Sequence, residues 1–426
     1  MSAVPITPQL PLDTILCGDA LDVLRTLPDN SVDAVVTDPP AGISFMGKHW
    51  DSDKGGRDAW IAWLASVMAE AWRVTKPGGH ALVWALPRTS HWTAMALEDA
   101  GWEIRDRCSH IFGSGFPKSL DVSKQLDKAA GATRKVTGKR WGAYPDTNRP
   151  STRSGPGTIE GMFGLASEAS YRDITAPATD AARTWDGWGT ALKPAVEDWW
   201  LVRKPLSERN VAANVLRWGT GALNIGASRV GNLGGTAKIA PSKRATVNAY
   251  GNGLNGGGCE PINAGRWPAN LLLSHAPECD ERGCSLWCPV RMLDAQSGVS
   301  RGNAKQGYPG GTTFGGGKMG DDVVGTWYGD TGGASRYFTT FRYQAKASRA
   351  NRSSNGAVNN THNTVKPTQL MSWLITLITP PGGIVLDPFA GSGSTLVAAK
   401  AGGWRYIGVE REPEYVAIAQ ARVRAS

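Results

Sequence analysis

Apolar runs alternate with amphipathic segments at both ends of the chain. Residues 14–17 and 32–37 are predicted to be strands, and residues 20–27 a helix with its leucines on one face. Residues 76–79, Lys-Pro-Gly-Gly, are predicted to form a turn. Further helices are predicted over 59–74, 370–378 and 394–401 and from about residue 413, and further strands over 80–86, 384–386 and 404–409. This alternation is typical of an α/β fold in which helices cover a parallel sheet.

The middle of the chain has a different pattern. Residues 131–190 and 226–335 are rich in Gly, Ser, Thr and Asn and contain few periodic apolar runs. A stretch of this length is unusual in a compact domain unless it binds a partner, and disorder of parts of it is the alternative. We therefore expect one α/β domain made of residues 1–130 and 336–426, and a Gly-rich, partly disordered insert over residues 131–335.

Composition indicates the class of partner and the redox environment of the protein. The 426 residues carry a formal net charge of +9, which favours a polyanionic partner. Apolar runs stay shorter than the roughly 18 residues of a membrane span, and the first residues lack a basic, apolar leader, so no membrane partner is expected. The six cysteines do not have the pattern of a disulfide scaffold, which favours a reducing, cytoplasmic environment.

A glycine-rich loop follows the predicted strand at 384–386. Its sequence, DPFAGSG, comprises Asp387, Pro388, Phe389, Ala390, Gly391, Ser392 and Gly393. Glycines at a strand-to-helix turn let the backbone approach a ligand, and an acid about 20 residues later is placed to bind ribose hydroxyls. Glu410 lies 23 residues after Asp387, at the end of the next predicted strand. This spacing predicts a nucleotide-like ligand containing adenosine, with a plain strand–helix turn as the alternative.

A second acidic motif ends the predicted strand at 32–37. Asp38 is followed by Pro39 and Pro40, which cannot continue a central strand. A carboxylate at such a rigid strand end, and the backbone carbonyl beside it, can accept hydrogen bonds from an amino group. A capped strand end without chemistry is the alternative.

Together these motifs carry a resemblance to a known family. The chain reads TDPPAGISFMGKHWD at 37–51, LKPAVEDWWLVRKPL at 192–206, HNTVKP at 362–367 and LDPFAGSGSTLVAAKAGGWRYIGVEREPEY at 386–415. It resembles the beta-group, amino-directed S-adenosylmethionine-dependent DNA methyltransferases, and within them the stand-alone enzymes that bacteriophages and prophages encode. In that group the DPP motif comes first, the target-recognition region lies in the middle and the cofactor loop comes last, which is the order found here.

The resemblance implies a Rossmann-like class I methyltransferase fold. Its seven-stranded, mostly parallel sheet would be circularly permuted, with residues 131–335 as an irregular target-recognition insert. The strand before the glycine loop would come first, the strand ending at Glu410 second, and the strands at 14–17 and 32–37 third and fourth. Such a permutation is tolerated when the chain termini lie close together.

The resemblance also implies roles for residues at the site. Asp38 and the Pro39 carbonyl, held by Pro40, would bind the exocyclic amine of a base flipped out of the duplex, and the amine would attack the methyl group in line. The family has an aromatic residue after DPP that stacks on this base, but this chain has Ala41. Phe45 is our candidate for the stacking residue, with His49 and Trp50 as alternatives.

The implied cofactor site draws on both ends of the chain. The resemblance assigns binding of S-adenosylmethionine to residues at strand ends and in loops, namely Asp19, Lys366, Pro367, Asp387, Pro388, Phe389, Ala390, Gly391, Gly393 and Glu410. In the family fold the acid after the third strand reaches the cofactor adenine, and the segment containing Lys366 lines the methionine end. For Lys366 a plain surface lysine is the alternative.

A basic stretch without acidic residues lies between residues 331 and 386. It contains four residues that we expect to contact the phosphates of double-stranded DNA, namely Arg342, Lys346, Arg349 and Arg352. A solvated basic face is the alternative.

Cysteines gather in the insert. A metal-ligand set of Cys259, His275, Cys279, Cys284 and Cys288 is available within 30 residues. Such a set can bind a structural zinc ion, although its spacing fits no CxxC template. Reduced, partly buried cysteines are the alternative.

The sequence thus predicts a site-specific DNA methyltransferase that acts on adenine N6. A cytosine-N4 enzyme is the first alternative, because Asp-Pro-Pro is more usual for adenine and Ser-Pro-Pro for cytosine in the family. An RNA or protein methyltransferase and a catalytically inactive DNA-binding protein are further alternatives. A monomer and a homodimer are both compatible with the sequence.

Overall fold

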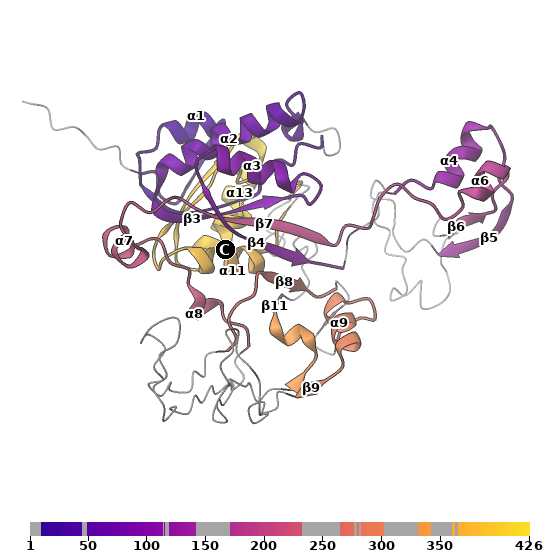
Figure 1. Cartoon of the computed structure of the whole chain (residues 1–426). Helices are drawn as coiled ribbons and strands as arrows, with labels where there is room; N and C mark the ends of the chain where they lie inside the picture. Colours follow the sequence, from indigo (N-terminus) through magenta and orange to yellow (C-terminus); the bar gives the residue numbers. More distant parts are fainter. Residues whose placement is uncertain are drawn as a thin grey trace, which may run out of the picture. The chain divides into compact units, whose positions relative to one another are not determined.

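The computed structural model describes most of both ends of the chain and parts of its middle. The described residues are 10–44, 49–113, 115, 119–141, 171–231, 265–276, 279–280, 283–301, 331–341, 360–362 and 365–426. They fall into two compact units, one formed by residues 1–114 and 195–426 and the other by residues 115–194 (Figure 1). None of the described helices is both long enough and apolar enough to cross a membrane.

One sheet dominates the larger unit. Among the described residues it has nine strands, in the order β1 (Thr14–Cys17), β13 (Arg405–Glu410), β12 (Ile384–Asp387), β2 (Val32–Thr37), β3 (Thr75–Ala85), β7 (Val196–Arg203), β4 (Glu103–Ile111), β8 (Leu271–Ser274) and β11 (Thr339–Phe341). β7 runs antiparallel to β3 and β4, and the other neighbouring strands pair in parallel. The sheet is therefore mixed but mostly parallel, as the class I methyltransferase fold requires.

The permuted strand order is confirmed. β12 precedes the glycine loop, β13 pairs with it, and the N-terminal β1 pairs with β13, so strands from opposite ends of the chain lie side by side. β2 pairs with the other edge of β12. The first seven strands of the order match the expected seven-stranded sheet, and β8 and β11 extend it.

Alternating side chains bury the sheet on both faces. Val35 belongs to one apolar cluster, whereas Ala34 and Val36 belong to the other, because successive strand residues point to opposite faces. The cluster with Val35 contains residues of α1 (Ala20–Arg25), α2 (Arg57–Val74) and α3 (Ser90–Asp99). The opposite cluster contains residues of α11 (Thr368–Ile378), α12 (Ser394–Ala401) and α13 (Pro413–Arg424). Figure 1 shows α1 to α3 on one side of the sheet and α11 on the other.

The predicted turn at residues 76–79 is wrong. These residues belong to β3, which begins at Thr75, and the register with β2 jumps from Val32–Thr75 to Ala34–His80. The extra residues form an irregularity in the strand, with Gly78 at a φ of 78°. Asn214 of α7 (Val211–Trp218) holds it, because its Nδ2 donates to the Pro77 carbonyl oxygen at 2.8 Å.

The smaller unit combines two helices with an antiparallel strand pair. It contains α4 (Val122–Ala129), β5 (Val136–Trp141), β6 (Tyr171–Thr175) and α6 (Asp180–Thr184). The carboxylate of Asp127 joins these elements, because it accepts hydrogen bonds from Arg134 at 2.6 Å and from the Thr179 backbone N–H at 2.9 Å.

The structure divides the chain at other points than the expected insert of residues 131–335. Residues 115–194 form their own unit, whereas β7 and β8 from the same range pair within the main sheet. β7 reads VEDWWLVR, and its Trp199 and Val202 are fully buried. Its place between β3 and β4 depends on pairing with strands about a hundred residues away, which no local pattern reveals.

Candidate functional site

Polar side chains gather at one edge of the sheet. β1, β13, β12 and β2 are parallel, so their carboxyl ends meet at the same edge. Cys17 is in register with Glu410, which brings Asp19 close to the end of β13. Asp387 ends β12, and Asp38 directly follows β2. The sequence therefore predicted correctly that the acidic residues of both motifs share this edge.

The glycine loop after β12 is shaped for close approach. Gly391 and Gly393 have φ angles of 52° and 78°, which favour glycine. A Cβ at Gly391 would lie 3.1 Å from the His362 ring, and one at Gly393 would lie 2.9 Å from Ala419. These two positions accept only glycine without strain, and they leave the loop backbone open.

A buried and a half-buried carboxyl group flank this loop. Asp387 accepts hydrogen bonds from Thr37 Oγ1 at 2.7 Å and from the Phe389 N–H at 3.1 Å. Burial raises the pKa of Asp387 to about 6, although hydrogen bonds from Thr395 and Thr37 oppose this. Glu410 accepts from the Gly391 N–H at 2.8 Å, and burial raises its pKa as well. The Glu410 carboxylate thus connects the end of β13 to the glycine loop.

The remaining predicted cofactor residues have structural contacts of their own. Asp19 caps α1, since its Oδ1 accepts from the Leu21 N–H at 2.9 Å. The Phe389 ring packs against Trp63 with centroids 5.7 Å apart. The Ala390 N–H donates to the Val409 carbonyl oxygen at 2.8 Å, which fixes the loop on β13. Pro388 lies between Asp387 and Phe389 within the same loop.

Asp38 stands at a strand end that several contacts make rigid. Pro39 is buried, and the Ala41 carbonyl oxygen accepts from Thr89 Oγ1 at 3.3 Å. The next residue is held too, because the Gly42 N–H donates to Asp51 Oδ1 at 2.9 Å. The Asp38 side chain is 21% exposed. Burial is the main cause that raises the pKa of Asp38 to about 7.

A lysine bridges Asp38 to a second carboxylate that sequence reasoning missed. Lys366 Nζ lies 3.4 Å from Asp38 Oδ2 and 3.6 Å from Glu197 Oε1. It also lies 3.9 Å from the centroid of the Trp84 ring, where a cation is favoured. Burial opposes ionisation of Glu197, but the charge of Lys366 and the neighbouring His110 lower its pKa to about 2. Lys366 thus lies between two carboxylates, and its expected place at the methionine end of a cofactor stays a prediction.

The network continues along the same edge of the sheet. His110 Nδ1 lies 3.8 Å from Glu197 Oε2, and its Nε2 is 2.8 Å from Ser274 Oγ. β7 runs antiparallel to its neighbours, so Glu197 at its start lies beside the carboxyl ends of β3 and β4. A signal was present in the sequence, because two adjacent acidic residues, Glu197 and Asp198, are unusual near the start of a strand with an apolar middle. Which side chains Glu197 contacts depends on the direction of β7, which the sequence does not show.

Other predicted site residues lie outside the described part of the chain. They are the stacking candidate Phe45, the DNA-contact residues Arg342, Lys346, Arg349 and Arg352, and the metal-ligand candidate Cys259. Of the alternative stacking residues, Trp50 is described. Its ring stacks on His362, with centroids 6.4 Å apart, and therefore lies near the glycine loop. Pro367 is the residue that precedes α11.

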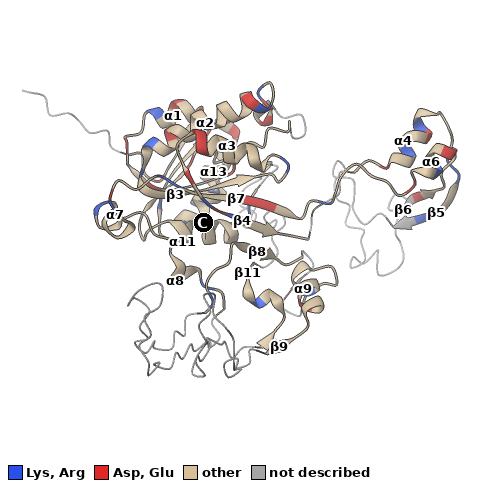
Figure 2. Ribbon diagram, viewed as in Figure 1, with Lys and Arg blue, Asp and Glu red and all other residues tan. Residues whose placement is uncertain are grey.

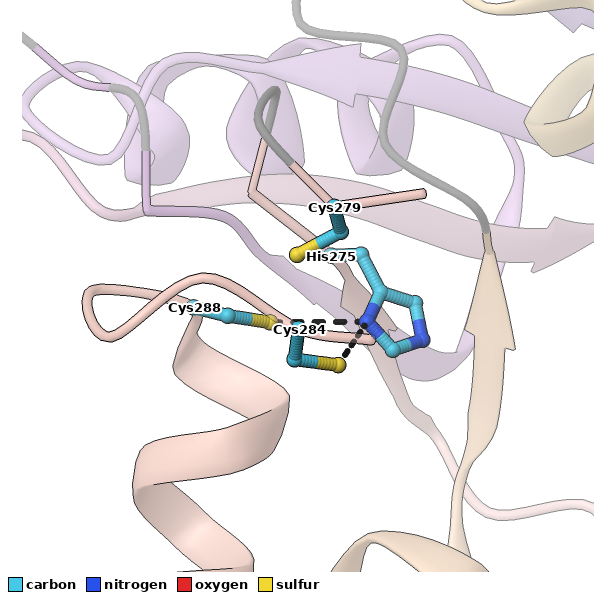
Figure 3. A group of neighbouring side chains, drawn as sticks. All are labelled: His275, Cys279, Cys284 and Cys288. Atoms are coloured by element: carbon cyan, nitrogen blue, oxygen red, sulfur yellow. Dashed lines mark hydrogen bonds between the residues drawn. The ribbon is translucent and has the colours of Figure 1, made fainter. Parts of the chain in front are cut away.

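Four of the five predicted metal ligands come together. The ligand atoms of His275, Cys279, Cys284 and Cys288 all lie within 4.8 Å of one another (Figure 3). All four residues lie in the connection between β8 and α9 (Pro289–Ser297).

The chain is similar to known DNA methyltransferases. A family profile described as DNA methylase matches residues 32–117 and 284–421, more than half of the chain. The type II methyltransferase M.HinfI of Haemophilus influenzae is 46% identical over 63 residues, which are 15% of this chain and 18% of that protein. The type II methyltransferase M2.DpnII of Streptococcus pneumoniae is 47% identical over 64 residues, 15% of this chain and 24% of that protein. The chain thus matches less than a quarter of the length of either relative.

The chain also aligns with a solved structure. The PvuII DNA methyltransferase, described as cytosine-N4-specific, aligns over 96% of this chain and 85% of its own chain. The sequence identity is 13% and the TM-score is 0.43.

Proposed function

The chain belongs to this DNA methylase family, and we propose that it transfers a methyl group from S-adenosylmethionine to the exocyclic amine of a base in double-stranded DNA, with adenine N6 as the target. One observation carries the proposal. The DPP motif and the glycine loop meet at one edge of the sheet, where Thr37, the neighbour of Asp38, donates a hydrogen bond to Asp387. A base-binding carboxylate and a nucleoside-binding loop are thereby held next to each other.

The residues present fit S-adenosylmethionine. Gly391 and Gly393 leave the loop backbone bare, as a close ligand requires, and an added Cβ would clash with His362 or Ala419. The carboxylates of Glu410 and Asp19 stand at the ends of neighbouring strands, where they can accept hydrogen bonds from ribose hydroxyls and an adenine amine. When bound, the cofactor supplies an electrophilic methyl group on a sulfonium.

The chain's own contribution is to position the amine and accept its proton. The lone pair of an exocyclic amine is delocalised into the base ring, which makes the amine a poor nucleophile. Hydrogen bonds from the amine to the Asp38 carboxylate and the Pro39 carbonyl oxygen would localise this lone pair. After attack, the amine nitrogen must lose a proton. Asp38, with a pKa of about 7, is matched to hold that proton near neutral pH.

Lys366 and Glu197 set the charge of Asp38. The cation 3.4 Å from Asp38 Oδ2 favours the ionised carboxylate, which is the form that accepts two hydrogen bonds. Glu197 holds that cation in place from the other side at 3.6 Å and, by its own negative charge, raises the pKa of Asp38. We infer that the pair tunes Asp38 and that both are positioning residues.

Adenine is proposed as the target base because the motif contains Asp-Pro-Pro, the form more usual for adenine in the family. The test is long-read sequencing of DNA from cells that express the chain, with Asp38→Ala as the control. Modified adenines in one short motif, absent in the control, would support the whole proposal. Modified cytosines would retain the mechanism and overturn the base.

The class of acceptor needs a separate measurement. Purified protein with labelled cofactor should methylate duplex DNA and leave RNA and protein acceptors unlabelled. A folded protein that binds cofactor but labels none of the three would overturn the proposal. The lack of an aromatic side chain at Ala41 would then be the first explanation to test.

We further propose that the unit of residues 115–194 contributes to target recognition. Basic residues lie on its α4 and β5 (Figure 2). Lys124, Lys128 and Lys139 are exposed. Trp185 and Trp188, 44% and 60% exposed, form an edge-to-face pair with ring centroids 4.9 Å apart. Exposed cations and exposed aromatic rings on one unit suit a nucleic acid, because cations neutralise phosphates and rings stack on bases.

Salt dependence tests this assignment. Replacing Lys124, Lys128 and Lys139 together by Ala should weaken duplex binding and reduce the slope of log affinity against log salt by up to about 3. Arg25→Ala, which removes an exposed cation of α1 in the other unit, is the matched control and should leave the slope unchanged. Equal slopes in the triple variant and the wild-type protein would assign recognition elsewhere.

A further inference from the structure

We propose that His275, Cys279, Cys284 and Cys288 bind one zinc ion, which fixes the connection between β8 and α9. The four ligand atoms lie within 4.8 Å of one another, and the three sulfur atoms and the imidazole ring converge on one point (Figure 3). This proposal does not depend on the catalytic function proposed above.

The spacing of the ligand atoms is close to that of a tetrahedral zinc site. Zn–S and Zn–N bonds of about 2.3 and 2.0 Å place neighbouring ligand atoms roughly 3.5 to 3.8 Å apart. His275 Nδ1 lies 3.2 Å from Cys284 Sγ and 3.4 Å from Cys288 Sγ. An expansion of a few tenths of an ångström would therefore admit the ion without a change of fold.

Backbone groups around the cluster favour negatively charged sulfur atoms. The Ser285 N–H points at Cys279 Sγ from 3.3 Å, a contact that favours the negatively charged sulfur. Cys288 is buried and occupies the N-cap position of α9, with Pro289 opening the helix. The positive end of the helix dipole thus lies at Cys288.

The donor set favours zinc in a structural role. Three thiolates and one imidazole form a closed tetrahedral shell that leaves no position for water or a substrate. Binding would release three protons from the thiols to solvent and leave a net charge of −1 on the neutral His275, three sulfurs and Zn²⁺.

The local core is small enough to need such support. The buried apolar residues around the cluster are Leu273, Ala276, Cys288 and Val290. His275 continues β8, and its backbone N–H donates to the Phe341 carbonyl oxygen of β11 at 3.0 Å. An ion here would tie β8 to α9, because its ligands come from the end of β8, the following loop and the start of α9.

Metal analysis of the full, tag-free chain tests the proposal. We expect about one zinc per chain in the wild-type protein. Cys284→Ser and Cys288→Ser should lose the metal. Cys17→Ser, at an exposed free cysteine far along the chain, is the matched control and should retain it. Cys259→Ser should retain the metal as well, because four ligands already complete the shell.

Protein grown with cobalt in place of zinc gives a readout that needs no variant. Tetrahedral cobalt with three thiolates should give intense visible absorption that zinc displaces, so the proposal remains testable even if the cysteine variants fail to fold. Wild-type protein that is folded, free of zinc after exposure to the metal and without this spectrum would overturn the proposal. So would a disulfide among these cysteines, or equal metal loss in Cys17→Ser or Cys259→Ser.

Discussion

The bridge from Lys366 to Asp38 predicts opposite changes in pH dependence for two variants. Lys366→Met removes the cation 3.4 Å from Asp38 Oδ2 but keeps an unbranched apolar side chain against Trp84. Glu197→Gln removes the opposing negative charge and keeps the shape of the side chain. The first change should raise the pKa of Asp38 and the second should lower it, because Lys366 lowers and Glu197 raises that pKa in the wild-type protein.

The size of the first change follows from Coulomb's law. Two unit charges 3.4 Å apart interact with about 1 kcal/mol in water and about 5 kcal/mol at an effective dielectric constant of about 20. One pKa unit corresponds to about 1.4 kcal/mol. Since Asp38 is 21% exposed, we take the lower part of this range and expect Lys366→Met to raise its pKa by about one to two units. For Glu197→Gln we predict the direction of the change.

The assay is the single-turnover rate of methyl transfer to duplex DNA across about pH 5.5 to pH 9.5, with cofactor and DNA saturating. Asp38 must be ionised to accept hydrogens from the amine, so the rate should fall about tenfold per pH unit below its pKa. The wild-type midpoint should lie at about 7. It should be higher in Lys366→Met and lower in Glu197→Gln. Midpoints that shift in the same direction, or that do not shift, would refute the tuning role of the bridge.

Three further predictions concern stability and cofactor binding. The pKa of Asp38 rises from 3.8 to about 7 on folding, so its ionised form destabilises the fold above that range. Asp38→Asn should therefore raise the free energy of unfolding at pH 8 by on the order of 2 kcal/mol. Denaturant titration measures this gain, which should disappear below about pH 4. Gly391→Ala should weaken cofactor binding at least about tenfold in calorimetry, because its φ of 52° and the His362 ring exclude a Cβ; Gly382→Ala, with a φ of 69° and open space, should bind normally. Leu374→Ala, at a fully buried position of α11, should cost about 3 kcal/mol of stability in the same titration, and a loss below about 1 kcal/mol would contradict its place in the core.

Local signals explain why both motif loops could be predicted. The strand at 32–37 and the helix at 394–401 have the predicted bounds, because Pro39 and Pro40 end the one and the glycine loop begins the other. Where a local signal competed with long-range pairing, pairing prevailed. The Lys-Pro-Gly-Gly segment is a strong turn signal, but β2 pairs with β3 on both sides of it, and backbone hydrogen bonds to Lys204 and the contact from Asn214 keep it within β3.

The sequence by itself determined the α/β architecture through short periodic patterns, and its motifs implied the permuted strand order through their resemblance to a known family. The two motif loops meet because the carboxyl ends of parallel strands share one edge of the sheet, where Thr37, the neighbour of Asp38, donates a hydrogen bond to Asp387. Only the tertiary structure decided the partners of Lys366. Glu197 reaches it from a strand 169 residues earlier, and does so because β7 runs antiparallel to its neighbours. The direction of a strand is set by pairing across the sheet and by the path of the chain between units, and a period-two pattern reads the same in both directions.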